Sequence, residues 1–309
     1  MPLNSQPITF EEIYEKALQL GWDDAGITQA VIPLEDAQAY SLWLDEGLHG
    51  DLEYMTNRIR TDPKQLLPNA RFALIFISNY KQPHAPFKED TGVVASYARG
   101  RDYHNVHFRR SKRMIRYLEE RSGQKNIARS FSDSKPIMEK ALAVQAGLGW
   151  FGKNSLLIHR RFGTFVLISG ILTTLDITHT PLRIYRDARC GVCTRCLDAC
   201  PTGALISPYK IDAAKCLSYH LIEKKGPVQK NIQEKNPGYA FGCDICQDVC
   251  PHNQRSPCAT SSDFQPSSGV GAYLTLEEID TIKLEGTPLK RRGIEGLRHN
   301  LDSSSPHRG

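Results

Sequence analysis

The spacing of apolar residues predicts a mixture of helices and strands over the first 180 residues. The run FEEIYEKALQL has apolar residues at helical intervals, and Thr9 is suited to cap its N-terminus. Helices are predicted over 10–20, 34–55 with breaks near Gly47 and Gly50, 105–121, and 134–147. Short β-rich runs cover 73–78 and 93–97, and 163–175 (GTFVLISGILTTL) is the most apolar candidate strand.

The pattern changes after residue 189. Cysteines and Cys-Pro pairs replace long periodic stretches up to residue 252, a polar segment follows over 259–271, and a helical tail is predicted over 275–301. We therefore divide the chain into an α/β domain over 1–180, an iron–sulfur module over 181–258, and a linker with a short helical tail over 259–309.

Composition narrows the class of protein. The 309 residues include 40% hydrophobic and 24% charged residues, which is typical of a globular protein in water. No apolar run approaches the roughly 20 residues that cross a bilayer, and the N-terminus lacks a secretory signal, so a cytoplasmic protein without membrane attachment is expected. In that reducing compartment, nine cysteines indicate metal or redox chemistry.

The cysteines form two related motifs. Cys190, Cys193, Cys196 and Cys200-Pro201 follow the bacterial ferredoxin pattern, in which three thiolates of one loop bind three irons of a [4Fe-4S] cubane. A second copy, Cys243, Cys246 and Cys250-Pro251, has Ala240 where its first cysteine should be, and Cys216 is the replacement.

In two-cluster ferredoxins the cysteine before proline binds the other cluster. This rule gives a first cluster held by Cys190, Cys193, Cys196 and Cys250. The second cluster is then held by Cys200, Cys216, Cys243 and Cys246, and Cys258 has no assigned role. The alternative is a pair of zinc ribbons, but those usually show two separate C-x2-C pairs without a triple followed by Cys-Pro.

Charge alone says little about a nucleic-acid partner. The formal net charge is +5, and two cubanes of about −2 each would bring it to about +1.

The run GLGWFG over 147–152 has G-x-G-x-x-G spacing, but it stands at the end of a predicted helix and is therefore not the dinucleotide fingerprint, which follows a strand. Three segments, ALAVQAGLGWFGKNSLL over 141–157, YARGRDYH over 97–104 and GCDICQDVCPHN over 242–253, together resemble the epoxyqueuosine reductases. The resemblance covers residues 5 to 300. Longer members carry a helical-repeat extension, which this sequence does not reach.

The resemblance implies a fold, a reaction and a set of cofactors. The fold would be α+β, with a nitroreductase-like cobalamin-binding α/β domain around a mixed sheet and a ferredoxin-like module with two [4Fe-4S] clusters. The substrate would be tRNA carrying epoxyqueuosine at the wobble position, and cob(I)alamin would remove the epoxide oxygen in a two-electron step that yields queuosine. An external low-potential reductant and a monomeric enzyme are expected.

Asp133 matches the proton donor of the family. A carboxyl packed against an apolar corrin face would have its pKa raised and hold a proton at neutral pH. The alternative is that Asp133 caps the helix predicted over 134–147, since Asp, Ser and a following Pro are common in caps.

The segment Asp102-Tyr-His104-Asn-Val-His107 departs from the D-x-H-x-x-G motif that supplies a histidine to cobalt, which fits base-off cobalamin without a protein ligand. Polar residues that suit the corrin amides and phosphate are the candidate contacts, with solvated or locally bonded side chains as the alternative. They are Arg58, Tyr97, Asp133, Lys153, Asn154, Ser155, Ser169 and Ser218.

Basic residues are the candidate contacts for tRNA phosphates, although each run alone also fits a solvated helix face. The chosen residues are Arg109, Arg110, Lys224, Lys225 and Arg291.

Three other functions remain open. A small-molecule reductive dehalogenase would use the same cofactors without RNA, a ferredoxin-type electron carrier would bind no corrin, and a zinc-held RNA-binding module would be colourless.

Overall fold

The computed structural model describes residues 7–180 and 189–304. Its largest sheet has four strands in the order β2 (Asp24–Gln29), β3 (Phe72–Asn79), β8 (Val166–Thr173) and β5 (Ala128–Phe131). Every neighbouring pair in this sheet is antiparallel. The α+β class is confirmed. The large sheet is antiparallel because no helical crossover joins parallel neighbours in it, and the mixed pairing occurs in a smaller sheet.

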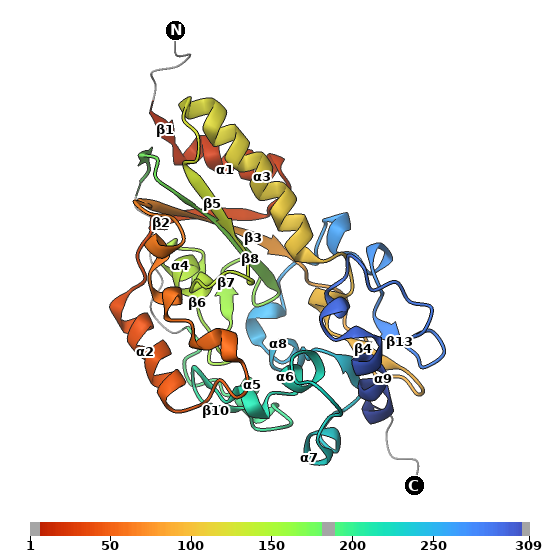
Figure 1. Cartoon of the computed structure of the whole chain (residues 1–309). Coiled ribbons are helices and arrows are strands. Elements are labelled where there is room, and N and C mark those ends of the chain that lie inside the picture. The colour runs from red at the N-terminus through yellow and green to blue at the C-terminus, as the bar shows by residue number, and fades with distance from the viewer. Residues whose placement is uncertain (1–6, 181–188, 305–309) are drawn as a thin grey trace.

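The central strand β3 is buried on both faces, which explains its uninterrupted apolar sequence. Leu74 and Phe76 pack on one side with α1 (Phe10–Gln19) and α3 (Tyr103–Ser122). Ala73, Ile75 and Ile77 pack on the other side with α4 (Glu139–Gln145). Figure 1 shows α1 and α3 together above the sheet and α4 below it.

The basic helix α3 agrees with the prediction and is well capped at both ends. Asp102 accepts a hydrogen bond from the backbone N–H of His104, and Gly123 ends the helix with a φ of 69°. Its buried residues recur at helical spacing against the sheet, and the arginines and lysines lie mostly on the other side. Packing of the apolar stripe therefore holds a strongly charged helix in place.

Helix α4 begins five residues later than predicted, at Glu139. Lys135 precedes Pro136 and is therefore disfavoured in the helical conformation, so the chain turns before the helix starts. Asp133 consequently does not cap this helix, whose N-cap is Met138.

The helix predicted over 34–55 is also shorter. Helix α2 (Leu34–Asp45) ends before Gly47, and 3-10 turns follow over Glu53–Thr56, Arg58–Thr61 and Pro63–Gln65. These turns bring residues 53 to 61 toward the predicted catalytic region, as shown below.

A three-stranded sheet connects the three predicted parts of the chain. Strand β12 (Tyr239–Phe241) of the cysteine-rich segment pairs parallel with β4 (Gly92–Val94), and β13 (Tyr273–Leu274) pairs antiparallel with β4. Helix α9 (Gly293–Ser304) packs against this sheet.

The tail is less helical than predicted, since 275–287 forms turns and α9 is preceded only by a 3-10 turn over Pro288–Arg291. The expected linker packs onto the body through Phe264, which is 2% exposed. The boundary placed at 180/181 adjoins residues 181–188, which lie outside the described residues.

Short elements complete the fold. They are β1 (Ile8–Thr9) with β9 (Ile177–Thr178), β6 (Gly149–Phe151) with β7 (Leu157–His159), β10 (Leu205–Ser207) with β11 (Lys210–Ile211), and the helices α5 (Arg195–Asp198), α6 (Leu217–Ile222), α7 (Lys230–Gln233) and α8 (Ile245–Asp248). Within the described ranges, no helix has both the length and the apolar character needed to cross a membrane.

Candidate redox and substrate site

Four of the predicted cluster ligands lie together near the surface. Burial, together with the negative charge of the neighbouring Cys190, Cys196 and Cys193, raises the pKa of the Cys250 thiol to about 11. Cys250 and Cys190 also pack with Trp150. Lys153 holds this loop by donating hydrogen bonds to the carbonyls of Gly191 and Cys193, at 2.6 and 2.9 Å.

The other four predicted ligands form a deeper group. Burial raises the pKa of Cys243 and of Cys246, and the charges of Cys216 and Cys200 add to this effect. Cys216 therefore lies beside Cys243 and Cys246 of the second motif, which lacks its first cysteine and needs one more thiol.

Backbone N–H groups point at several of these sulfur atoms. Burial raises the pKa of Cys200, but hydrogen bonds from the N–H of Leu205, the Thr202 hydroxyl and nearby N–H groups outweigh it, so the net pKa lies below its ordinary value. Cys216 receives N–H groups from Tyr219 and Ser218. Donors of this kind stabilise anionic sulfur and suit an iron–sulfur cluster.

Among the described residues, no three His, Cys, Asp or Glu side chains converge on a single metal ion. A cubane binds one thiolate at each of four iron atoms, so its ligands lie further apart than those of one ion. The two groups of four thiols fit that donor set.

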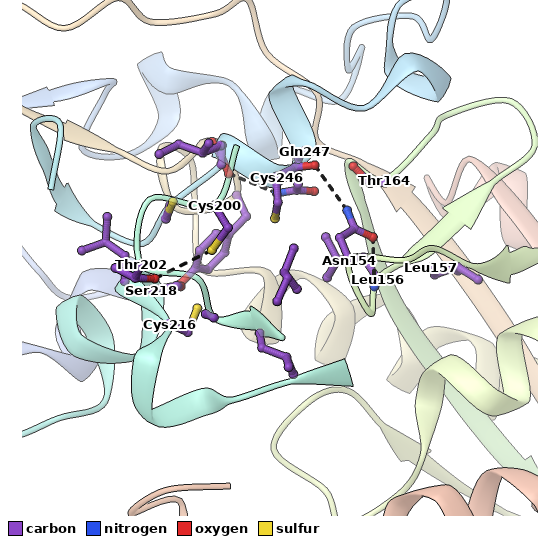
Figure 2. Close-up of a pocket in the computed structure, with 18 of the residues that line it drawn as sticks. Asn154, Leu156, Leu157, Thr164, Cys200, Thr202, Cys216, Ser218, Cys246 and Gln247 are labelled. Carbon is purple, nitrogen blue, oxygen red and sulfur yellow. Dashed lines mark hydrogen bonds between the residues drawn. The ribbon is translucent and has the colours of Figure 1, made fainter. Parts of the chain in front are cut away.

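A cavity of about 350 Å³ lies between the deeper thiol group and the large sheet. Cys200, Cys216, Cys243 and Cys246 line one wall, and Asn154, Leu156 and Val166 belong to the opposite side. Figure 2 shows the sulfur atoms of Cys200 and Cys216 turned toward this space, with Asn154 across from them.

Three predicted cobalamin contacts line this cavity, namely Tyr97, Asn154 and Ser218. Asn154 is 4% exposed and donates to the carbonyl of Cys246 at 3.4 Å, so it bridges the cavity wall and the cysteine loop. Ser155 follows with a φ of 63°, and its buried Oγ has no hydrogen-bond partner among the described residues. The carbonyl of Ser155 accepts from Lys140, which lines the cavity.

Three other predicted contacts lie elsewhere. Arg58 is exposed and pairs with Asp45 at 3.7 Å, and Lys153 holds the surface cysteine loop. Ser169 lies on the opposite face of β8, where its Oγ accepts the indole N–H of Trp22 at 3.1 Å. Side chains alternate along a strand, so Val166 and Ile168 face the cavity and Ser169 cannot.

Polar cavity residues and an unpartnered hydroxyl fit a large cofactor with amide and phosphate groups. Tyr97, Asn154, Ser218 and Lys140 would contact such a group, and Ser155 would supply a further hydroxyl. A corrinoid in this position would lie against the deeper thiol group.

Asp133 lies beside Tyr103, His104 and Glu139. Its Oδ2 accepts a hydrogen bond from Tyr103 Oη at 2.8 Å and lies 3.3 Å from His104 Nε2. The other ring nitrogen of His104 lies 2.8 Å from Asp102 Oδ1. The Asp133 side chain keeps 65% of its surface accessible, so a substrate can reach it, and its φ of 43° suits an aspartate in a tight turn.

The expected rise in the pKa of Asp133 is not observed. Burial raises this pKa, but hydrogen bonds from His104 and Tyr103 lower it more, so the carboxyl is ionised at neutral pH. The protonated groups are its neighbours. Burial lowers the pKa of His104, yet Asp102 and Asp133 raise it to about 9, and burial together with the charge of Asp133 raises the pKa of Glu139 to about 8.

The predicted tRNA contacts fall into different environments. Arg110 is 7% exposed and bonds Ser78, Ser261 and Asp263, so it belongs to the interior and the phosphate assignment is wrong. Arg109 and Lys225 are exposed. Lys224 pairs with Asp51 at 3.1 Å, and Arg291 with Glu223 at 2.6 Å.

Several residues of this site were not predicted from the sequence. Tyr103, His104 and Glu139 contact Asp133, and Lys140 lines the cavity. The available signal was that Tyr103 and His104 are the last two residues of the YARGRDYH segment; Glu139 had none beyond its place in a helical pattern.

Two groups of four thiols, one of which lines a cavity, are characteristic of an iron–sulfur oxidoreductase. A family model described as a 4Fe-4S double cluster binding domain matches residues 189–253, and one described as epoxyqueuosine reductase QueG, DUF1730, matches residues 60–134.

Curated relatives extend this similarity over nearly the whole chain. Epoxyqueuosine reductase of Leadbetterella byssophila is 36% identical, covering 94% of this chain and 96% of that protein. The enzyme of Cellulophaga algicola is 35% identical, with 97% and 99% covered, and that of Escherichia coli is 33% identical, with 94% and 79% covered. The chain belongs to the epoxyqueuosine reductase family.

Solved structures agree with this assignment. A crystal structure of epoxyqueuosine reductase with an epoxyqueuosine-modified tRNA-Tyr stem loop superimposes with a TM-score of 0.82 at 25% identity, covering 96% of this chain and 80% of that one. The Streptococcus thermophilus enzyme gives 0.81 at 27% identity, with the same coverage.

Proposed function

We propose that this chain reduces epoxyqueuosine to queuosine at the wobble position of tRNA. The observation that carries the proposal is the combination of three features: a group of thiols for one cluster, a cavity next to it, and an exposed carboxylate with protonated neighbours. Relatives over nearly the full chain carry this activity in their names, and one solved relative holds the modified stem loop.

The reaction requires electrons and protons in equal number. An epoxide takes up two electrons and two protons, both C–O bonds break, and the products are an alkene and water. When bound, the two clusters would supply the electrons, and base-off cobalamin would supply the reducing nucleophile at the substrate.

This chain's own residues would handle the protons. Asp133 is ionised in the free protein, so a proton must reach it before it can donate to the departing oxygen. His104 holds a proton at neutral pH and faces Asp133 at 3.3 Å. We assign Asp133 as the donor to the substrate and His104 as the group that recharges it, with Tyr103 fixing the carboxylate.

Glu139 is a second proton source. It holds a proton below about pH 8 and accepts a hydrogen bond from the backbone N–H of Asp133. Two protonated groups beside one carboxylate match the requirement for two protons.

The ligand sets also belong to this proposal. Cys190, Cys193, Cys196 and Cys250 would bind the outer cluster, and Cys200, Cys216, Cys243 and Cys246 the cluster next to the cavity. An external reductant would reach the outer cluster first. We further propose a monomer that acts in the cytoplasm, where the thiols stay reduced.

The test is an anaerobic reaction of the reconstituted protein with cobalamin, reductant and tRNA from cells that cannot complete queuosine. Mass spectrometry of the nucleosides should show loss of one oxygen atom. An unchanged nucleoside in the presence of fully loaded, reduced protein would reject the proposal.

A further inference from the structure

Tyr54 is an exposed aromatic residue with two arginines close to its ring. It lies in the 3-10 turn Glu53–Thr56 with 49% of its surface accessible. The guanidinium carbons of Arg60 and Arg291 each lie 5.7 Å from its ring centroid. The two arginines come from segments more than 200 residues apart in the sequence, so the fold itself assembles this arrangement.

This group lies next to the proton-handling residues. Burial raises the pKa of the Tyr54 hydroxyl, and the negative charges of Glu223 and Asp133 raise it further. Asp133 also acts on Arg291, and the charge of Arg60 acts on Glu139. Tyr54 and its arginines therefore lie within electrostatic range of Asp133 and Glu139.

A nucleoside can bring its modified group to a carboxylate of the protein only if it leaves its stack. The base next to it then loses a stacking partner, and single-stranded RNA commonly regains one on an aromatic side chain. Phosphates on either side need cationic groups at the same place.

We propose that Tyr54 is the platform on which the anticodon-loop base adjacent to the wobble nucleotide stacks, while Arg60 and Arg291 bind the flanking phosphates. This inference rests on the proposed function, because it assumes that the wobble nucleoside reaches Asp133.

Glu223 holds Arg291 until RNA arrives. Two hydrogen bonds of 2.6 Å join the Arg291 guanidinium to both oxygens of Glu223. Such a bidentate pair keeps the guanidinium beside Tyr54 and neutralises it in the free protein. A phosphate offers the same fork-like geometry, so RNA competes with Glu223 for Arg291.

Phe108 provides a matched control. It is the more exposed aromatic, at 63%, and lines a separate groove with Arg101, Arg109 and Glu285. If RNA bound any exposed ring near an arginine, Tyr54→Ala and Phe108→Ala would both bind RNA more weakly. The proposal predicts weaker binding for Tyr54→Ala alone.

The experiment measures binding of an unmodified anticodon stem-loop to the cluster-loaded protein by fluorescence anisotropy, without reductant. Tyr54→Ala should weaken binding about tenfold or more, and Tyr54→Phe should stay within about threefold of the wild type. Phe108→Ala should bind like the wild type. Glu223→Gln should bind more tightly, since it frees Arg291 and removes a negative charge.

A stem-loop lacking the base beside the wobble position identifies the stacked base. On that RNA the difference between Tyr54→Ala and the wild type should disappear. Iron content and circular dichroism check folding, and Tyr54→Leu, which keeps apolar bulk but has no aromatic face, substitutes if Tyr54→Ala does not fold.

Equal binding by Tyr54→Ala and the wild type would overturn the proposal, as would an equal loss on the RNA without that base. Unchanged RNA binding with slower cluster reduction by an external donor would assign this surface to the donor instead. Binding that depends on Tyr54 without loss of oxygen in the turnover assay would reject the proposed reaction and leave the platform intact.

Discussion

His104 Nε2 lies 3.3 Å from Asp133 Oδ2, and this contact sets the protonation of both side chains. It lowers the pKa of the carboxyl and raises that of the imidazole to about 9. The residue expected to donate a proton is therefore ionised, and the proton resides on its neighbour. In the proposed reaction Asp133 donates a proton to the substrate, and His104 replaces that proton on Asp133.

Removing the carboxylate tests the first role. Asp133→Asn should retain both clusters and corrinoid but lose turnover by at least about a hundredfold, because a positioned acid contributes that much or more. Single-turnover rates measure the loss. Asp176→Asn is the control, since Asp176 is also an exposed aspartate in an ion pair, with Arg71, and lies beyond the other end of β8. Wild-type turnover by Asp133→Asn would remove the assignment.

The pH dependence of turnover tests whether His104 supplies the proton. The pKa of His104 is raised from 6.5 to about 9, so its pair with Asp133 is complete below pH 6.5 and is lost as the pH rises through about 9. Turnover should fall over that alkaline range. His104→Gln should be slower at neutral pH and should lack the decline near pH 9, so that only the loss of the Glu139 proton near pH 8 remains. An unchanged decline near pH 9 in the variant would assign it to another group.

Iron content tests the ligand sets. Cys216→Ala should lower the iron bound after anaerobic reconstitution from about eight to about four atoms per chain, since one cubane loses a ligand. Cys258→Ala removes an exposed thiol and should keep about eight. Eight irons in Cys216→Ala would show that the second motif takes its fourth ligand elsewhere.

Substitutions of two buried polar residues, Asn154 and Ser169, test which face of β8 the cofactor contacts. Asn154→Ala should reduce corrinoid retention after gel filtration, because Asn154 lines the cavity. Ser169→Ala should retain corrinoid like the wild type but unfold at lower temperature, because the Trp22 indole N–H loses its acceptor, at a cost of about 1–3 kcal/mol. The reverse pattern would place the cofactor on the other face of β8.

Local sequence patterns predicted what short-range forces decide. The apolar run at 73–78 became β3, because an uninterrupted apolar run suits a strand that is buried on both faces. The basic segment from 105 became α3, because helical spacing of its apolar residues selects one buried face. The spacing of Cys190 to Cys200 likewise indicated iron–sulfur ligands without any knowledge of the fold.

Long-range packing decided the rest. Nothing near Ser169 in the sequence indicates that Trp22, 147 positions away, donates a hydrogen bond to its hydroxyl. Arg110 appeared to belong to a phosphate track, yet helical rotation turns it inward to Asp263. The pKa of Asp133 depends on Tyr103 and His104, about thirty residues before it, so burial alone gave the wrong direction.

Electron counting tests the central claim most directly. The cluster- and cobalamin-loaded protein is given a measured number of electron equivalents under anaerobic conditions, mixed with epoxyqueuosine tRNA, and the nucleosides are counted by mass spectrometry. One queuosine for every two electrons, and none without corrinoid, is the predicted result. Queuosine formed at the same yield without corrinoid, or electrons consumed without loss of oxygen, would contradict the account.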